Sequence, residues 1–165
     1  MRKHPGALSG ATAAFALAAS AMAAGPTAKT IEYPTGYRDF THVKSMVIQQ
    51  GHPLFEAFGG IHHIYANDAA LGGYRTGRFP DGAVIVFDLL AAPSEKGAVT
   101  EGDRKVLAVM VKDRAAFPDT GGWGFEAFGG GQPDKRAVGA NAVSACFACH
   151  EGQKAKDYVF SAWRE

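Results

Sequence analysis

Short apolar stretches, separated by Gly, Pro, Asn and Asp, recur between residues 43 and 128. They are rich in Val, Ile, Phe and Tyr, which is typical of β-strands bounded by turns. Strands are predicted over residues 43–49, 60–66, 83–90, 105–112 and 123–128. Because most of these stretches follow one another without a long helix between them, the pattern favours an antiparallel sheet.

Helical patterns occur mainly at the two ends of this series. Residues 37–42 hold a short helical turn, and residues 68–76 are predicted to form a helix with Asn67 or Asp68 as its cap and Gly77 as its stop. The Gly-rich run 129–134 is a loop. Asn141 is expected to cap a helix over residues 142–151, and residues 156–163 are expected to form a last helix. The prediction is an α+β domain, mainly antiparallel sheet with a few short helices.

One hexamer, Phe-Glu-Ala-Phe-Gly-Gly, occurs twice, at residues 55–60 and 125–130. The sequences that follow the two copies differ, whereas a structural repeat would extend over a whole supersecondary unit. We interpret the copies as two similar strand-to-turn corners, or as coincidence.

The N-terminal 24 residues resemble a secretory signal peptide. Arg2 and Lys3 form a basic start, an Ala-rich run follows over residues 7–19, and residues 21–23 (Ala-Met-Ala) provide a cleavage site. The run is too short, and too interrupted by Gly and Ser, to predict a membrane-spanning helix in the mature protein. A disordered tail is the alternative. Export predicts a periplasmic protein, with a flexible lead-in over residues 25–34 and one domain over residues 35–165.

The charge of the mature chain excludes some classes of partner. Arg2 and Lys3 account for two of the 17 basic residues, and 16 residues are acidic, so the exported chain is close to neutral. A neutral chain without a basic stripe lacks the electrostatic signature of nucleic-acid binding. No basic amphipathic stretch predicts attachment to a membrane surface.

The strongest chemical signal is the C-x-x-C-H run of residues 146–150, which contains the only two cysteines of the chain. Thiols at this spacing can each form a thioether with a haem vinyl group, and the adjacent His can then ligate the iron. The motif predicts one covalent haem (heme c) held by Cys146, Cys149 and His150, with His150 as the metal ligand. Export agrees with this, since haem is attached in this way outside the cytoplasm.

Three alternatives to haem fit less well. A zinc site needs four ligands, and this segment offers three without a second Cys pair. A thioredoxin-like C-x-x-C follows a strand in a parallel βαβ unit, whereas this one follows a Gly/Ala-rich loop. A disulfide that closes so small a ring removes little entropy from the unfolded chain.

Several motifs, taken in order, resemble the cytochrome P-460 family, which includes the cytochromes c′-beta. They are residues 52–63 (HPLFEAFGGIHH), 74–82 (YRTGRFPDG), 111–113 (VKD), 121–123 (GGW) and the C-terminal C-x-x-C-H, and the similarity covers nearly all of residues 33–163. The resemblance implies a mainly antiparallel β protein, commonly a homodimer, with one c-type haem per chain. It also implies a five-coordinate iron with His150 on one side and an open distal side.

The family has two functional groups. Members with a lysine cross-linked to the porphyrin oxidise hydroxylamine, whereas c′-beta members lack the link and bind gases such as nitric oxide beneath aromatic side chains. The alignment places Phe87 at the cross-linking position, and no Lys occurs from residue 57 to residue 95. This favours the c′-beta type.

Phe87 is therefore expected to cover the distal side of the haem, with Phe58 as a second aromatic residue. An ordinary core position is the alternative for both. His62 and His63 are adjacent on a strand and point to opposite faces, so only one can reach the haem, and His62 is favoured. Met46 and Met110 are candidates for an axial sulfur, although gap-filling is the commoner role of Met in apolar strands.

Three functions thus remain open. The first is a periplasmic cytochrome that binds nitric oxide or another small ligand, the second is an oxidoreductase acting on hydroxylamine or nitric oxide, and the third is an electron carrier with a sixth iron ligand and a redox partner protein.

Overall fold

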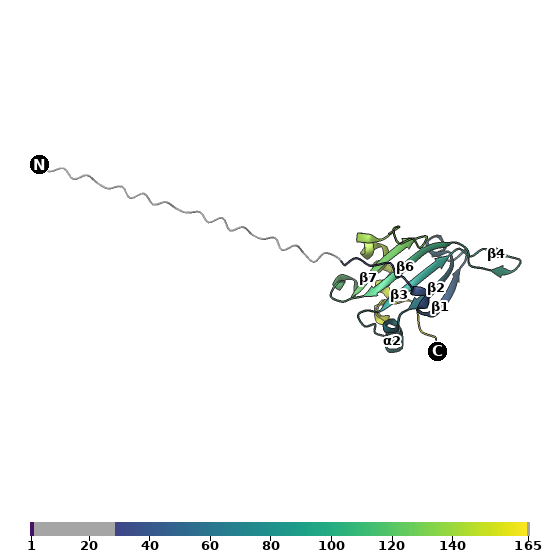
Figure 1. The fold of residues 1–165 in the computed structure, drawn as a ribbon, viewed down its shortest axis with the longest axis horizontal. Helices are drawn as coiled ribbons and strands as arrows, with labels where there is room; N and C mark the ends of the chain where they lie inside the picture. The colour runs from purple at the N-terminus through teal and green to yellow at the C-terminus, as the bar shows by residue number, and fades with distance from the viewer. Residues whose placement is uncertain (2–28, 165) are drawn as a thin grey trace.

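A five-stranded antiparallel sheet forms the centre of the molecule (Figure 1). The structure is a computed structural model and describes Met1 and residues 29–164. The strand order is β1-β2-β3-β6-β7, and every neighbouring pair is antiparallel. The α+β prediction with a mainly antiparallel sheet is confirmed. The strands span Thr41–Ile48 (β1), Gly60–Ala66 (β2), Val84–Leu90 (β3), Arg104–Lys112 (β6) and Trp123–Gly129 (β7).

A small hairpin that the apolar pattern did not predict extends between β3 and β6. Its strands are Ser94–Glu95 (β4) and Ala98–Val99 (β5), and they form a separate two-stranded sheet. Lys96 and Gly97 connect them with φ values of 50° and 82°. Positive φ at two successive turn residues matches the right-handed twist of a tight hairpin. Two-residue strands that are exposed throughout have no apolar alternation from which to predict them.

Helices are short. The longest α-helix, α2 (Asp68–Thr76), has the predicted bounds; Asn67 Oδ1 accepts the backbone N–H of Ala70, and Gly77 ends the helix with φ 74°. The others are η1 (Tyr37–Asp39), α1 (Phe55–Phe58), η2 (Pro118–Thr120) and a C-terminal helical segment made of η3 (Gly139–Asn141), η4 (Val143–Phe147), α3 (Ala148–His150) and η5 (Glu151–Lys156). Within residues 29–164 we find no helix long and apolar enough to cross a membrane.

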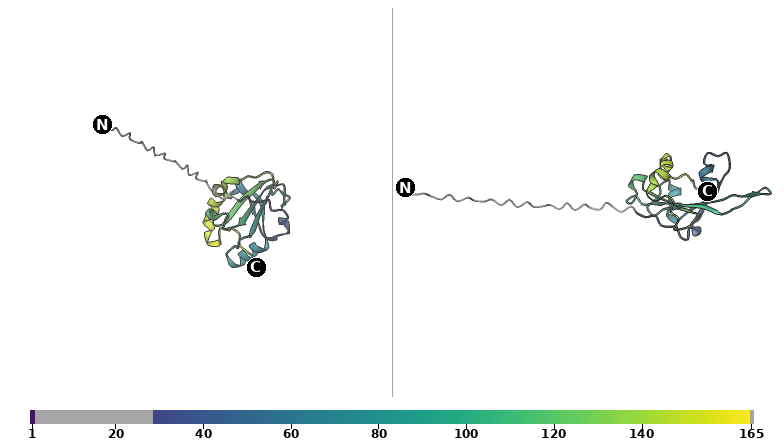
Figure 2. Two further views of the ribbon diagram at one scale, coloured as in Figure 1. Left: turned by 60° about the vertical axis from the view of Figure 1, so that its left-hand side comes forward. Right: turned by 90° about the horizontal axis from the view of Figure 1, so that it is seen from above.

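The two faces of the sheet carry separate apolar clusters, because successive strand residues point to opposite sides. One face, here called the helical face, contains Ile64, Ile85, Met110 and Phe125, and half-buried Phe147 of the C-terminal segment packs against its cluster. The opposite face is covered by residues 31–40. The right-hand view of Figure 2 shows the C-terminal helical segment and α1 on one side of the sheet and η1 on the other. The helical face is therefore bordered by two helical elements that are far apart in sequence.

The two copies of the repeated hexamer adopt different structures, so the interpretation as two similar strand-to-turn corners is wrong and the alternative, coincidence, is left. Residues 55–58 form helix α1, whereas residues 125–129 lie in strand β7. In β7 the strand pairing with β6 stabilises the extended form, with Met110 opposite Phe125 and Leu107 opposite Phe128.

The helix predicted over residues 142–151, which carries the C-x-x-C-H run, is confirmed as part of the helical segment 143–156, but its cap and the residues after it differ from their prediction. No last helix forms over residues 156–163, because Asp157 and Tyr158 have φ values of 51° and 67° and no regular structure follows them. Asn141 does not cap the helical segment, since it lies inside η3 and makes no side-chain cap. Burial of Val159, which is 2% exposed, pulls the chain back toward the core in place of a helix.

Residues 1–24, for which a signal peptide is predicted, lie outside the described part of the chain apart from Met1. The described residues of the lead-in, 29–34, have no regular structure but pack on the face opposite the helical face. Ile31 is 7% exposed there, and the ring of Tyr33 contacts that of Phe128 at 5.0 Å.

Candidate haem site

The C-x-x-C-H motif lies in the C-terminal helical segment, over the helical face. Cys146 belongs to the π-helical η4, and Cys149 and His150 belong to α3. The change of hydrogen-bond pattern occurs inside the motif, as π-helical turns often do at functional positions. Both thiols are free, Cys146 half-buried against the core and Cys149 exposed. Burial, with the charge of Glu126 and the neighbouring Cys149, raises the pKa of the Cys146 thiol.

His150 is held as a neutral imidazole of one tautomer. Its Nδ1 lies 2.7 Å from the carbonyl oxygen of Tyr158. Since a carbonyl only accepts hydrogen bonds, Nδ1 carries the proton, and the lone pair of Nε2 is left for a metal. Burial lowers the pKa of His150 although the Tyr158 carbonyl opposes this. The rings of Phe125 and Phe160 flank the imidazole at 5.0 and 4.9 Å. This is the arrangement of a histidine prepared as an iron ligand.

Glu126 anchors the start of the helical segment, a role that the sequence analysis did not assign. It lies in the edge strand β7 and is 5% exposed. Its carboxylate accepts the backbone N–H groups of Val138 at 3.0 Å and Gly139 at 3.3 Å, and Arg136 at 3.2 Å. Burial alone would raise the pKa of Glu126, but these bonds outweigh it and lower the pKa. A Glu inside an apolar strand pattern was the available signal.

The three residues predicted for the distal side come together on the helical face. Phe87 of β3 packs against His62 of β2, with ring centroids 4.6 Å apart and the ring planes tilted by 31°, and meets Phe58 of α1 edge-on at 5.8 Å. His62 is 7% exposed, and its Nδ1 is buried without a hydrogen-bond partner among the described residues. Burial first, then the charges of His63 and Lys44, lower the pKa of His62. The group is aromatic and uncharged at neutral pH.

The other candidates separate by face. His63 points away from His62, and its Nδ1 lies 2.6 Å from Ser45 Oγ. Met110 is in the core cluster of the helical face and 9% exposed, which is a packing position. Met46 is 46% exposed and lies opposite His62 in the β1–β2 register.

Lys44 is a residue of this face that the sequence analysis did not single out. It is opposite Ile64 in the register of β1 and β2, and directly opposed residues of an antiparallel pair share a face. Lys44 therefore lies on the side of His62, close enough for its charge to lower the pKa of that imidazole. It stands outside the lysine-free stretch 57–95, and only the strand register reveals that it shares a face with His62.

The residues present fit a haem. On one side a free imidazole lone pair and two thiols are available, and Phe160 beside His150 is 55% exposed. On the other side Phe58 is 40% exposed although it contacts Phe87. Exposed aromatic rings beside both groups form the apolar surface that a porphyrin would cover. Across residues 29–164, no group of three His, Cys, Asp or Glu side chains is arranged to hold a bare metal ion.

A comparison with protein families decides the assignment. The family model described as Cytochrome P460 matches residues 34–161, which include the sheet, the aromatic group and the C-x-x-C-H motif. The chain belongs to the cytochrome P460 family. The resemblance seen in the sequence motifs is confirmed. The protein is accordingly a c-type cytochrome with haem as its cofactor. No curated protein matches the chain.

Proposed function

We propose that this cytochrome P460 family member is an exported protein with one haem c, attached through Cys146 and Cys149 and ligated by Nε2 of His150. Its distal side binds nitric oxide or another small neutral gas. The observation that carries the proposal is the group formed by Phe58, Phe87 and His62, which is aromatic and holds a buried, neutral imidazole.

The chemistry of this group suits a neutral diatomic ligand. Aromatic rings exclude water and offer no strong hydrogen bond, so nitric oxide or carbon monoxide binds without losing polar contacts. Cleavage of peroxide needs a distal acid or base with a pKa suited to proton transfer. His62 is the one polar member of the group, and its lowered pKa keeps it uncharged near neutral pH. Gas binding is favoured over peroxide chemistry.

Absorption spectra of the purified holoprotein test this proposal. A high-spin ferric spectrum, and a ferrous form that takes up carbon monoxide and nitric oxide, are expected. A low-spin spectrum unresponsive to both gases would refute the proposal and favour an electron carrier with a sixth ligand, for which His62 and exposed Met46 lie on the required face.

A second candidate is an oxidoreductase acting on hydroxylamine or nitric oxide, and Lys44 is the observation that favours it. The family resemblance implies that the enzymatic members carry a lysine cross-linked to the porphyrin. Lys44 lies on the helical face, on the strand next to that of His62. A denatured pyridine haemochrome distinguishes the two. Ordinary c-type bands, unchanged in Lys44→Met, support the gas binder, whereas altered bands that become ordinary in Lys44→Met support the enzyme.

Location and assembly complete the proposal. The protein is periplasmic, which rests on the signal-like N-terminus, and forms a homodimer, which rests on the family resemblance. We place the interface at the apolar recess that Phe40, Val84, Val109 and Val111 form with residues 29–34, opposite the helical face. Light scattering on the purified holoprotein measures the dimer directly, and a monomer at micromolar concentration would contradict it. A redox partner protein is required only by the carrier and enzyme alternatives.

A further inference from the structure

The turn after the haem motif has an unfavourable backbone conformation. Asp157 and Tyr158 are consecutive residues with φ values of 51° and 67°, and neither is glycine. The left-handed region brings Cβ close to the backbone, so side-chain-bearing residues stay there only when surrounding contacts require it. This turn is also the one that presents the carbonyl oxygen of Tyr158 to Nδ1 of His150 at 2.7 Å. The unfavourable conformation and the contact to the iron ligand thus occur at the same peptide.

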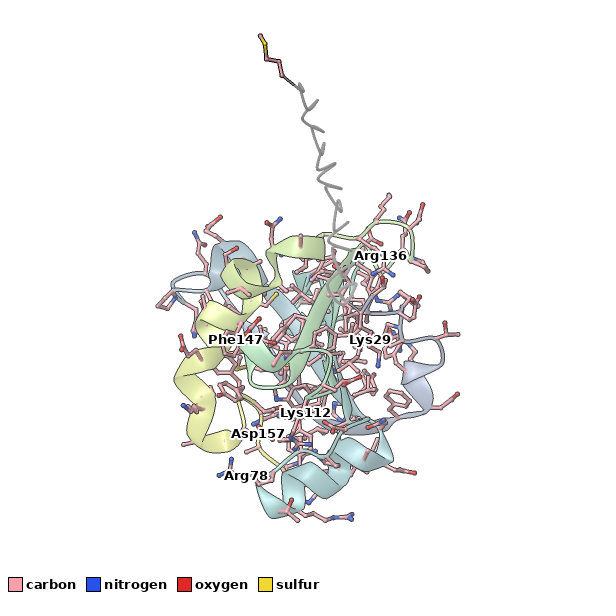
Figure 3. The ribbon with its side chains drawn as sticks, turned by 90° about the vertical axis from the view of Figure 1, so that its left-hand side faces the viewer. Lys29, Arg78, Lys112, Arg136, Phe147 and Asp157 are labelled. Carbon is pink, nitrogen blue, oxygen red and sulfur yellow. The ribbon has the colours of Figure 1, made fainter. Side chains whose placement is uncertain are left out.

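A set of buried contacts holds this turn in place. Asp157 is 6% exposed, and one carboxylate oxygen accepts Lys112 Nζ at 2.7 Å while the other accepts the backbone N–H of Phe79 at 2.8 Å. The backbone carbonyl of Asp157 accepts Trp123 Nε1 at 2.8 Å. Figure 3 shows Lys112 and Asp157 beside each other next to the C-terminal segment. The contacts come from β6, β7 and the loop after α2, so three separate parts of the fold fix one turn.

Lys112 is a buried lysine whose side-chain contacts lie around this turn. It is 2% exposed, donates a second hydrogen bond to the carbonyl of Gly121 at 2.9 Å and lies 4.8 Å from the centroid of the Trp123 ring. Burial lowers the pKa of Lys112 against the opposing effect of Asp157. A buried ion pair costs desolvation and adds little net stability over an apolar pair. Here the pair joins the turn at Asp157 to strand β6.

We propose that Lys112 and Asp157 are positioning residues for the iron ligand. They hold the carbonyl of Tyr158 against Nδ1 of His150 and so determine the tautomer, the ring orientation and the basicity of the imidazole. The inference rests on the proposed ligation of the iron by His150. A firm acceptor at Nδ1 increases the electron donation from Nε2, because partners of the outer shell raise the basicity of a ligating histidine. Stronger donation favours ferric over ferrous iron.

The test uses the full-length holoprotein with Asp157→Asn. Asn tolerates the left-handed conformation and retains an acceptor, but it removes the charge that faces Lys112. We expect the iron–histidine stretching band of the ferrous form, measured by resonance Raman spectroscopy, to move to lower frequency and the reduction potential to rise. Trp123→Phe is a second variant, because it keeps the ring and deletes only the N–H that holds the Asp157 carbonyl.

The matched control is Asp113→Asn. Asp113 is the residue after Lys112 and also pairs with a lysine, Lys29, at 2.7 Å, but this pair is exposed and outside the site. We expect neither readout to change in this control. If the iron–histidine band keeps its frequency in both Asp157→Asn and Trp123→Phe, even with lower thermal stability, Lys112 and Asp157 have only a structural role. Equal shifts in the control would overturn the inference as well. Absence of an iron–histidine band in the wild type would instead refute ligation by His150, and with it both the inference and the proposed function.

Discussion

Residues 55–60 and 125–130 have the same sequence but different secondary structures. In the first copy, Phe55–Phe58 form a helical turn without a buried residue. In the second, the equivalent residues form part of the edge strand β7, where Phe128 is fully buried and Glu126 is 5% exposed. Local propensity is identical in the two copies, so the difference comes from the partners that each one meets. Strand β6 provides a complete ladder for the second copy.

The two copies also serve opposite sides of the candidate site. The first supplies Phe58, which meets Phe87 beside His62. The second supplies Phe125, which contacts the ring of His150, and Glu126, which holds the start of the helical segment. One sequence therefore contributes a half-covered ring on the side proposed as distal and a buried scaffold on the side proposed as proximal. Substituting equivalent positions in both copies measures how much the tertiary surroundings change the effect of a residue on stability and ligand binding.

The largest contrast is expected for the last Phe of each copy. Phe128→Ala should lower the free energy of unfolding by about 3–5 kcal/mol, because it removes a fully buried ring from the core. Phe58→Ala should lower it by less, about 1–2 kcal/mol, since Phe58 is 40% exposed until the proposed haem covers it. Denaturant unfolding of both holoproteins measures the difference. Similar losses would mean that the haem buries Phe58 as deeply as the sheet buries Phe128.

The next largest difference in stability is expected for the last glycine of each copy, Gly60 and Gly130. Gly60 has a φ of 134°, and an added Cβ would clash with the backbone carbonyl of Leu90, so Gly60→Ala should cost about 2–3 kcal/mol. Gly130 has a φ of 59°, and its added Cβ would lie 3.4 Å from a flexible Gln132 side chain, so Gly130→Ala should cost about 1 kcal/mol. Thermal unfolding provides the comparison. A larger loss at Gly130 would contradict the close approach of Gly60 in β2 to the Leu90 carbonyl in β3.

The glutamates should differ in stability and in its pH dependence. Glu126→Gln should cost about 1–3 kcal/mol, because three charge-assisted contacts are weakened, whereas exposed Glu56→Gln should stay within about 0.5 kcal/mol. Since the folded pKa of Glu126 is below its unfolded value of 4.5, its stabilisation is complete above pH 4.5 and disappears as the pH falls through the folded pKa. Acid titration of stability should therefore be less steep below pH 4.5 in Glu126→Gln only. Parallel curves would show that Glu126 binds its partners without charge.

The last comparison concerns ligand binding instead of stability. Phe58→Ala should speed carbon monoxide association with the ferrous protein several-fold, because one ring of the distal group is lost. Leu54→Ala is the control, since Leu54 precedes α1 and is 49% exposed. Stopped-flow mixing gives the rates. Equal rates in wild type and Phe58→Ala would remove Phe58 from the distal side and leave the first hexamer copy without a function.

Much of the fold was accessible from local patterns. Strand β2 and helix α2 have the predicted bounds, and β3, β6 and β7 differ from their predictions by a residue at an end. These elements are predictable because alternating burial along a strand and the caps of a helix are visible in residues that are close together in the sequence. The helix bounds around residues 139–158 were less accessible, because Glu126 and Asp157 act there from distant positions or through unusual backbone angles.

By itself the sequence determined the α+β class, most of the strands and the haem-attachment motif, since periodicity and short spacing are local properties of the chain. Only the tertiary structure decided which copy of the hexamer is a helix, that Lys44 shares a face with His62, and that the Tyr158 carbonyl meets His150. These depend on strand register and on backbone groups that every residue carries. No residue type marks such a group in advance, so contact between distant parts of the chain is what selects it.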